Sequence, residues 1–234
     1  MKISFFEEFT TLENLNKLKL VTFPTRLFLA DYSVEGFKAI RDRINNPLVK
    51  ECIYWPILNM HEGYWFSRFT KRNALLRQFN ILMKVKVPVM IDLELPFLTK
   101  KLFFTEFFKS FKNSKYLKGF IQRYFKRVYT ANYFNCKVED LHHKPIVMMY
   151  SSMLKVTKEK KKEKLEALHK QFEDRLLAGL GAIGTGILGN EKQLSLEQLR
   201  EDLELCKELK IKEVVIYRLG GLDEEYIEVI KEFS

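Results

Sequence analysis

Short apolar runs rich in Val, Ile, Phe and Tyr alternate along the chain with longer stretches in which apolar residues recur at helical spacing. The runs are almost continuously apolar, as strands are when both faces of a parallel sheet are covered. They predict strands at Ile3–Phe6, Arg26–Ala30, Glu51–Ile57, Val87–Leu93, Val128–Tyr133, Ile146–Ser151, Leu176–Ile183 and Glu213–Tyr217. The stretches with helical spacing predict helices at Val34–Ile44, Lys71–Met83, Lys158–Phe172, Leu196–Leu209 and Glu224–Phe233.

This regular alternation predicts parallel strands joined by crossover helices. Eight such units in 234 residues, with no linker rich in Pro, Gly or Ser, predict a single (β/α)8 TIM barrel over residues 1–234. An open doubly wound sheet is the alternative, and the lack of a GxGxxG turn after the first strand counts against its dinucleotide-binding form. The connection after the fifth strand, Cys136–His143, is short for a full helix. In a barrel, catalytic residues lie on the loops that follow the strands.

The composition and the N-terminal sequence indicate where in the cell the protein is expected. No apolar run reaches the ~18 residues that a membrane span needs, and acidic residues interrupt the sequence MKISFFEEF, where a secretion signal would be apolar. We therefore expect a cytoplasmic protein. The three cysteines are far apart and form neither a metal-binding knuckle nor a disulfide framework. Lys and Glu are plentiful and Gln is scarce, a bias typical of thermophilic sources.

Acidic residues stand at the ends of the first four predicted strands. They are Glu7, Glu8, Asp31, Glu62, Asp92 and Glu94. Acids are also common at helix starts, where the positive end of the helix dipole stabilises them. This explanation suits Asp31, which precedes Ser33. It suits Asp92 poorly, because Asp92 stands inside an apolar strand, where an unpaired charge is costly.

Asp92 and Glu94 are two residues apart on a strand and therefore point to the same face. If that face is the barrel interior, the two carboxylates converge at the mouth. Repulsion between them then raises one pKa toward the range of a general acid at neutral pH. The alternative is a structural pair satisfied by lysine or backbone groups. We favour a catalytic pair, with Glu94 as proton donor, Asp92 as its partner, and Glu7 or Glu62 as base.

The motif Asp-Leu-Glu, entered from Pro88–Ile91, resembles the Asp-x-Glu signature on the fourth strand of several barrel glycoside hydrolases. These include chitinase-like enzymes and barrel-type muramidases. In those families the Glu is the general acid and the Asp assists it, so the resemblance implies these roles for Glu94 and Asp92. The extra upstream aspartate of the longer chitinase motif is absent, because Val87 and Val89 stand where acids would be expected.

Aromatic residues near the third strand are candidates for holding a sugar, because a sugar ring stacks its C–H face on an aromatic ring. Trp55 lies in a predicted strand and is expected in the core, whereas Trp65 lies in a polar loop. Tyr150 and Arg218 stand near the ends of the sixth and eighth strands. The predicted substrate-binding residues are Trp65, Tyr64, His61, Asp31, Tyr150 and Arg218.

The net charge of +10 is concentrated in one segment. Lys100–Arg127 holds nine basic residues and one acid, Glu106, and eight of the twenty phenylalanines lie between Phe97 and Phe125. We expect residues 97–127 to form a basic, Phe-rich helical excursion after the fourth strand. It either packs on the barrel with a solvated basic face, or grips an anionic ligand or membrane surface. Nucleic acid would suit the charge alone, but no nucleic-acid motif is found.

Glycine-rich loops follow the last two predicted strands. Their candidate phosphate-binding residues are Gly184, Thr185, Gly186, Gly220 and Gly221. Barrels often bind phosphate at these loops through backbone N–H groups, although glycines also simply allow tight turns. These loops support an alternative function, that of a Mg²⁺-dependent enzyme acting on a phosphorylated or lipid-phosphate substrate, with the same acids as metal ligands.

The pattern as a whole favours a hydrolase that cleaves a glycosidic bond in an oligosaccharide or small-molecule substrate without a cofactor or metal. The Mg²⁺-dependent enzyme is one alternative. A non-catalytic barrel that binds a partner or a membrane through residues 97–127 is the other. None of the four histidines has HxH or HExxH spacing, which counts against a zinc hydrolase. We expect no nucleic-acid partner, and the sequence leaves the oligomeric state open.

Overall fold

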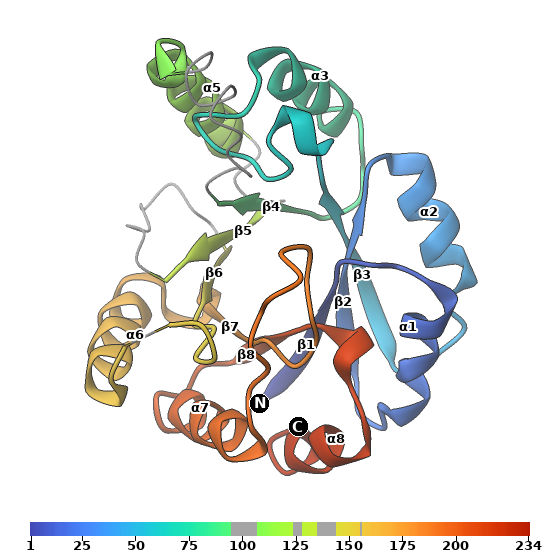
Figure 1. Cartoon of the computed structure of the whole chain (residues 1–234), viewed down its shortest axis with the longest axis vertical. Helices are drawn as coiled ribbons and strands as arrows, with labels where there is room; N and C mark the ends of the chain where they lie inside the picture. The colour runs from blue at the N-terminus through green and yellow to red at the C-terminus, as the bar shows by residue number, and fades with distance from the viewer. Residues whose placement is uncertain (95–106, 124–127, 135–143, 155) are drawn as a thin grey trace.

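A computed structural model shows eight parallel strands closed into a barrel, with helices arranged around its outside (Figure 1). It describes residues 1–94, 107–123, 128–134, 144–154 and 156–234. Each strand pairs with the next, and β8 closes onto β1. The strands are β1 (Lys2–Glu7), β2 (Thr25–Asp31), β3 (Val49–Pro56), β4 (Val89–Leu93), β5 (Val128–Tyr133), β6 (Lys144–Met148), β7 (Leu177–Gly181) and β8 (Glu213–Tyr217).

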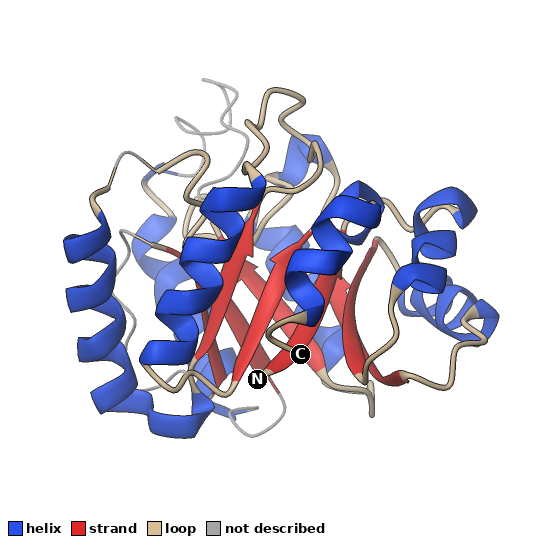
Figure 2. Cartoon of the chain, turned by 90° about the horizontal axis from the view of Figure 1, so that it is seen from below, coloured by secondary structure: helices blue, strands red, loops and turns tan. Residues whose placement is uncertain are grey.

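Helices surround the strands, which are seen from the side in Figure 2. They are α1 (Leu12–Asn16), η1 (Lys17–Leu20), α2 (Val34–Arg43), η2 (Met60–Glu62), α3 (Arg72–Leu82), α5 (Ser110–Arg123), α6 (Lys158–Phe172), η4 (Glu173–Arg175), α7 (Leu196–Glu208), η5 (Leu219–Gly221) and α8 (Glu224–Lys231). The predicted (β/α)8 barrel is confirmed, and the predicted elements differ from the observed ones by a few residues at their ends. The connection Cys136–His143 lies outside the described residues.

Side-chain caps explain where several helices begin. The side chains of Ser33, Thr157 and Asp223 each accept a hydrogen bond from a backbone N–H in the first turn of the following helix. Ser195 and Gln198 cap each other reciprocally at the start of α7. These bonds satisfy N–H groups that have no partner within the helix, so the polar residue before each apolar stretch fixes the start of the helix.

Packed aromatic rings fill the centre of the barrel. The ring of Phe6 lies 5.3 Å from that of Phe28 and 5.6 Å from that of Trp55. Phe28 also meets Tyr129 edge to face at 5.3 Å. The interior is therefore a solid core, as in other barrels of this kind. A site for a small molecule has to lie above this layer, at the carboxyl ends of the strands.

Part of the basic segment predicted over residues 97–127 is described, namely residues 107–123, and it contains α5. Phe120 stacks on Phe79 of α3 with 3.9 Å between ring centroids. At the other end, Phe108 and Phe111 are 91% and 81% exposed. Among the described helices, none is long and apolar enough to cross a membrane.

Candidate active site

The alternation of side chains along the strands decides which residues reach the barrel mouth. Phe6 on β1 belongs to the barrel interior, so Glu8, two residues later, points into the mouth. Met90 on β4 is also interior, and Asp92 and Glu94 follow it on the same face. These acids line one cavity of about 130 Å³. Its lining residues are Glu8, Trp55, Trp65, Asp92, Glu94, Tyr150, Met153, Ile187, Leu188, Glu191 and Tyr217.

Asp92 and Glu94 share this cavity, as expected from their spacing. Asp92 is only 3% exposed, and its Oδ1 has no hydrogen-bond partner within the described part of the chain. Burial, followed by the charges of Glu94 and Glu8, raises the pKa of Asp92 well above its ordinary value. Burial and the charge of Glu8 raise the pKa of Glu94 from 4.5 to about 7. Glu94 is thus half protonated near neutral pH.

Glu8 is held by three hydrogen bonds. The hydroxyls of Tyr64 and Tyr217 donate to its two oxygens over 2.8 and 2.5 Å, and the backbone N–H of Ile187 donates over 3.0 Å. Burial raises the pKa of Glu8, and the two tyrosine bonds act in the opposite direction. Gly186 leaves room for the Tyr217 hydroxyl, because a Cβ there would lie 1.9 Å from its oxygen. Glu8 is therefore a fixed acceptor facing the other two acids.

Four aromatic side chains complete the cavity wall. They are Trp55, Trp65, Tyr150 and Tyr217. Trp55 Nε1 is buried and has no hydrogen-bond partner among the described residues. Burial and the charges of Glu94, Asp92 and Glu8 raise the pKa of Tyr150 well above its ordinary value, so its hydroxyl stays a proton donor. Flat apolar faces beside polar donors suit a ligand that has both C–H faces and hydroxyl groups.

Glu7 and Arg218, two of the predicted site residues, lie outside the cavity lining and bind each other. Arg218 Nη1 is 3.1 Å from Glu7 Oε1, and Arg218 Nε donates to the Thr185 carbonyl over 2.8 Å. The Phe9 backbone N–H and the Asn14 amide donate to the same Glu7 oxygen. Burial raises the pKa of Glu7, partly offset by Arg218. This ion pair ties the end of β1 to the loop after β8.

The other predicted residues of the third-strand loop are also outside the cavity lining, except Trp65. Glu62 forms a two-pronged pair with Arg77 of α3, over 2.9 and 2.7 Å. Hydrogen bonds from Arg77 hold the pKa of Glu62 below its ordinary value, which suits a structural anion better than a proton acceptor. The Tyr64 hydroxyl donates to Glu8, and His61 is exposed on η2.

Asp31, the predicted site residue at the end of β2, is also outside the cavity lining. It accepts a hydrogen bond from the Ser33 N–H over 2.8 Å at the start of α2.

The glycine-rich loops after β7 and β8 pack against each other. A Cβ on Gly184 would lie 2.9 Å from the Gly221 Cα, and one on Gly221 would lie 2.1 Å from the Ile183 carbonyl oxygen. The Gly220 N–H donates to Glu7 Oε2 over 2.6 Å, so a carboxylate of the chain itself uses this N–H group. Among the described side chains, no group of three His, Cys, Asp or Glu residues is arranged to hold a metal ion.

Sequence reasoning did not select Glu8, Tyr217 or Glu191 as site residues, and it assigned Trp55 to the core. The signal for Tyr217 is its position as the last residue of β8, two residues after the interior Val215. Glu8 had the same kind of signal on β1. Glu191 lies in the loop after β7, where no periodic pattern indicates its direction.

Solved structures of chitinase-like glycoside hydrolases share the barrel fold of this chain. The glycoside hydrolase domain of PgaB (BpsB) from Bordetella bronchiseptica is similar at 10% identity and a TM-score of 0.61, over 99% of this chain and 98% of that chain. A chitinase from Chromobacterium violaceum is similar at 8% identity and 0.61, over 99% and 98%. The chitinase ChiB from Flavobacterium johnsoniae follows at 13% and 0.59, over 99% and 93%. No family model and no curated protein matches the sequence.

Proposed function

We propose that the protein hydrolyses a glycosidic bond in an oligosaccharide and that Glu94 is its general acid. The observation that supports this most strongly is the cavity shared by Asp92, Glu94 and Glu8, in which burial and the charge of Glu8 raise the pKa of Glu94 to about 7. An acid with a pKa near the working pH is still protonated there and gives up its proton readily.

In the proposed reaction, Glu94 donates its proton to the glycosidic oxygen while the bond from that oxygen to the anomeric carbon breaks. Positive charge then develops on the sugar ring. Asp92 orients the proton donor, and the fixed carboxylate of Glu8 stabilises the positive charge. Water adds to the anomeric carbon, and the proton that it loses restores Glu94. Glu7 and Glu62 have no role in this scheme, because each is engaged in an ion pair.

Chitin oligosaccharides are the first substrates to test, because two of the similar solved structures are chitinases. The rings of Trp55 and Trp65 in the cavity wall offer apolar faces for sugar units. Trp55 Nε1, which has no hydrogen-bond partner among the described residues, offers a donor for a sugar hydroxyl. A panel of fluorogenic glycosides with other sugars then extends the search.

The decisive variant is Glu94→Gln, which keeps the shape of the side chain and removes its proton. We expect kcat to fall by ~10²–10⁴-fold, the usual contribution of a general acid. The matched control is Glu62→Gln, the same chemical change outside the cavity, which should retain activity. Activity of the parent should also decline as pH rises through about 7, where Glu94 loses its proton. Full activity of Glu94→Gln, or no hydrolysis of any glycoside by the parent, would contradict the proposal.

A further inference from the structure

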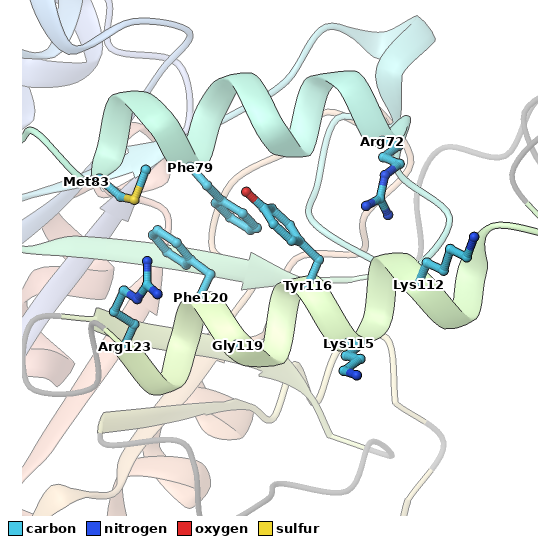
Figure 3. A pocket seen from close by; sticks show the side chains of 9 residues that line it. All are labelled: Arg72, Phe79, Met83, Lys112, Lys115, Tyr116, Gly119, Phe120 and Arg123. Atoms are coloured by element: carbon cyan, nitrogen blue, oxygen red, sulfur yellow. The ribbon is translucent and has the colours of Figure 1, made fainter.

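A second cavity lies far from the acids, in the groove between α3 and α5, and we call it the α3–α5 groove (Figure 3). It encloses about 450 Å³, within the size range of sites for small ligands. Its floor is aromatic. Phe79 lies 3.9 Å from Phe120 and 5.5 Å from Tyr116 between ring centroids, with both pairs stacked. Met83 lines the end of the groove next to Phe120.

Four cations line the rim of this apolar groove, and none of its described lining residues is acidic. They are Arg72, Lys112, Lys115 and Arg123. Within the described part of the chain, Lys112, Lys115 and Arg123 have no ion-pair partner. The first turns of α3 and α5 contain no acidic residue. Arg72 therefore stands at the positive end of the α3 dipole and Lys112 at that of the α5 dipole. A cation at this end of a helix does not stabilise the helix, but the two together attract anions.

Two exposed phenylalanines stand near the start of α5, close in sequence to the groove-lining Lys112. α5 begins at Ser110, Phe111 directly precedes Lys112, and Lys115 lies one turn after Phe111 on the same side of the helix. Phe108 precedes the helix and is 91% exposed. Large apolar side chains at this level of exposure, next to lysines, are typical of segments that rest on a lipid surface.

Gly119 lines the groove, and close packing does not require a glycine at this position. A Cβ added there would have no heavy atom within 4 Å. Glycine in the middle of a helix lowers helix stability relative to alanine, and here it leaves the groove open. A larger side chain at this position would fill the groove without disturbing the core.

We propose that the α3–α5 groove and the adjoining Phe108 and Phe111 bind anionic phospholipid at a membrane surface. The headgroup phosphates meet Lys112, Lys115 and the two arginines, the apolar floor takes acyl carbons, and the two phenylalanines enter the bilayer. Positive charge with no acid among the described lining residues is complementary to an anionic headgroup, and a mostly apolar groove is complementary to a lipid chain. Nucleic acid would match the charge but not the groove floor.

The test is co-sedimentation of the full chain with vesicles of phosphatidylcholine alone and of phosphatidylcholine mixed with phosphatidylglycerol. We expect binding only to the mixed vesicles, weakening as salt rises. The double variant K112E/K115E should bind roughly tenfold less or weaker still. The matched control is K158E/K160E on α6, which changes the net charge equally on exposed residues of a helix away from the groove. It should bind within about threefold of the parent. α6 lies at another place around the barrel than α5 (Figure 1), and charges farther from the groove than the Debye length of ~8 Å are largely screened.

Gly119→Leu separates a lipid site from a general basic surface, because it leaves every charge in place. We expect weaker binding to the mixed vesicles and a thermal midpoint at least equal to that of the parent. Equal losses in K112E/K115E and K158E/K160E, unchanged binding of Gly119→Leu, or no binding to the mixed vesicles at low salt would each overturn the proposal. Binding of a single-stranded oligonucleotide in place of the vesicles, lost in K112E/K115E, would replace lipid with nucleic acid.

Discussion

Glu8→Gln tests the electrostatics of the cavity more directly than any change of the acid itself. Gln keeps the size of the side chain and can still bond to Tyr64 and Tyr217, but it removes one negative charge. Burial is the larger cause of the rise in the pKa of Glu94 from 4.5 to about 7, and the charge of Glu8 is the smaller. Loss of that charge therefore lowers the pKa of Glu94, while burial still holds it above its ordinary value.

The pKa of Glu94 in the Glu8→Gln variant should accordingly lie below about 7 and above 4.5. Carbon-13 NMR titration of the side-chain carboxyl carbons measures this without a substrate, and the Glu94→Gln variant identifies the resonance. The alkaline limb of the pH–activity profile should move to lower pH by the same amount. An unchanged or higher pKa of Glu94 would show that Glu8 does not act on it, and would refute the reasoning.

Three further predictions concern stability. Burial and neighbouring acids raise the pKa of Asp92 well above its ordinary value of 3.8. A carboxyl whose pKa is raised in the folded state loses stability as pH rises from the ordinary value toward the raised one, so the Tm of the parent should fall with rising pH more steeply than that of Asp92→Asn. Parallel Tm profiles in scanning calorimetry would count against this. Gly221→Ala forces a Cβ onto the Ile183 carbonyl and should destabilise the fold by ~1–3 kcal/mol. Gly119→Ala, with open space around it, should stabilise by ~0.5–1 kcal/mol in urea unfolding, and the opposite order would contradict both.

The barrel could be predicted from the sequence because the alternation of apolar strands and amphipathic helices is long and regular. The relative direction of Asp92 and Glu94 was also predictable, since residues two apart on a strand share a face. Which face they share was not. The strands are covered on both sides, so Phe5 and Phe6 are both almost fully buried, and hydrophobicity does not distinguish the interior of the barrel from its outer surface.

The same limit explains why Glu7 rather than Glu8 was selected from the end of the first strand. Both acids follow an apolar run, and only the closed barrel shows that Glu8 continues the interior row. The pairing of Glu62 with Arg77 was beyond sequence reasoning for another reason. The two residues belong to a loop and a helix, and their meeting depends on how that helix packs. Roles of single acids in loops are therefore the least predictable part of such a site.

Barrel closure has a consequence for biosynthesis. β1 pairs with β8, and Tyr217 donates to Glu8 across 209 residues of sequence. A ribosome adding ~5–20 residues per second needs roughly 10–40 s to cover that separation. During this time β1 keeps an unpaired edge, the kind of edge that recruits other strands. The acidic cavity is thus among the last features to form on the growing chain. Synthesis that stalls before β8 leaves an open, aggregation-prone sheet without a completed site.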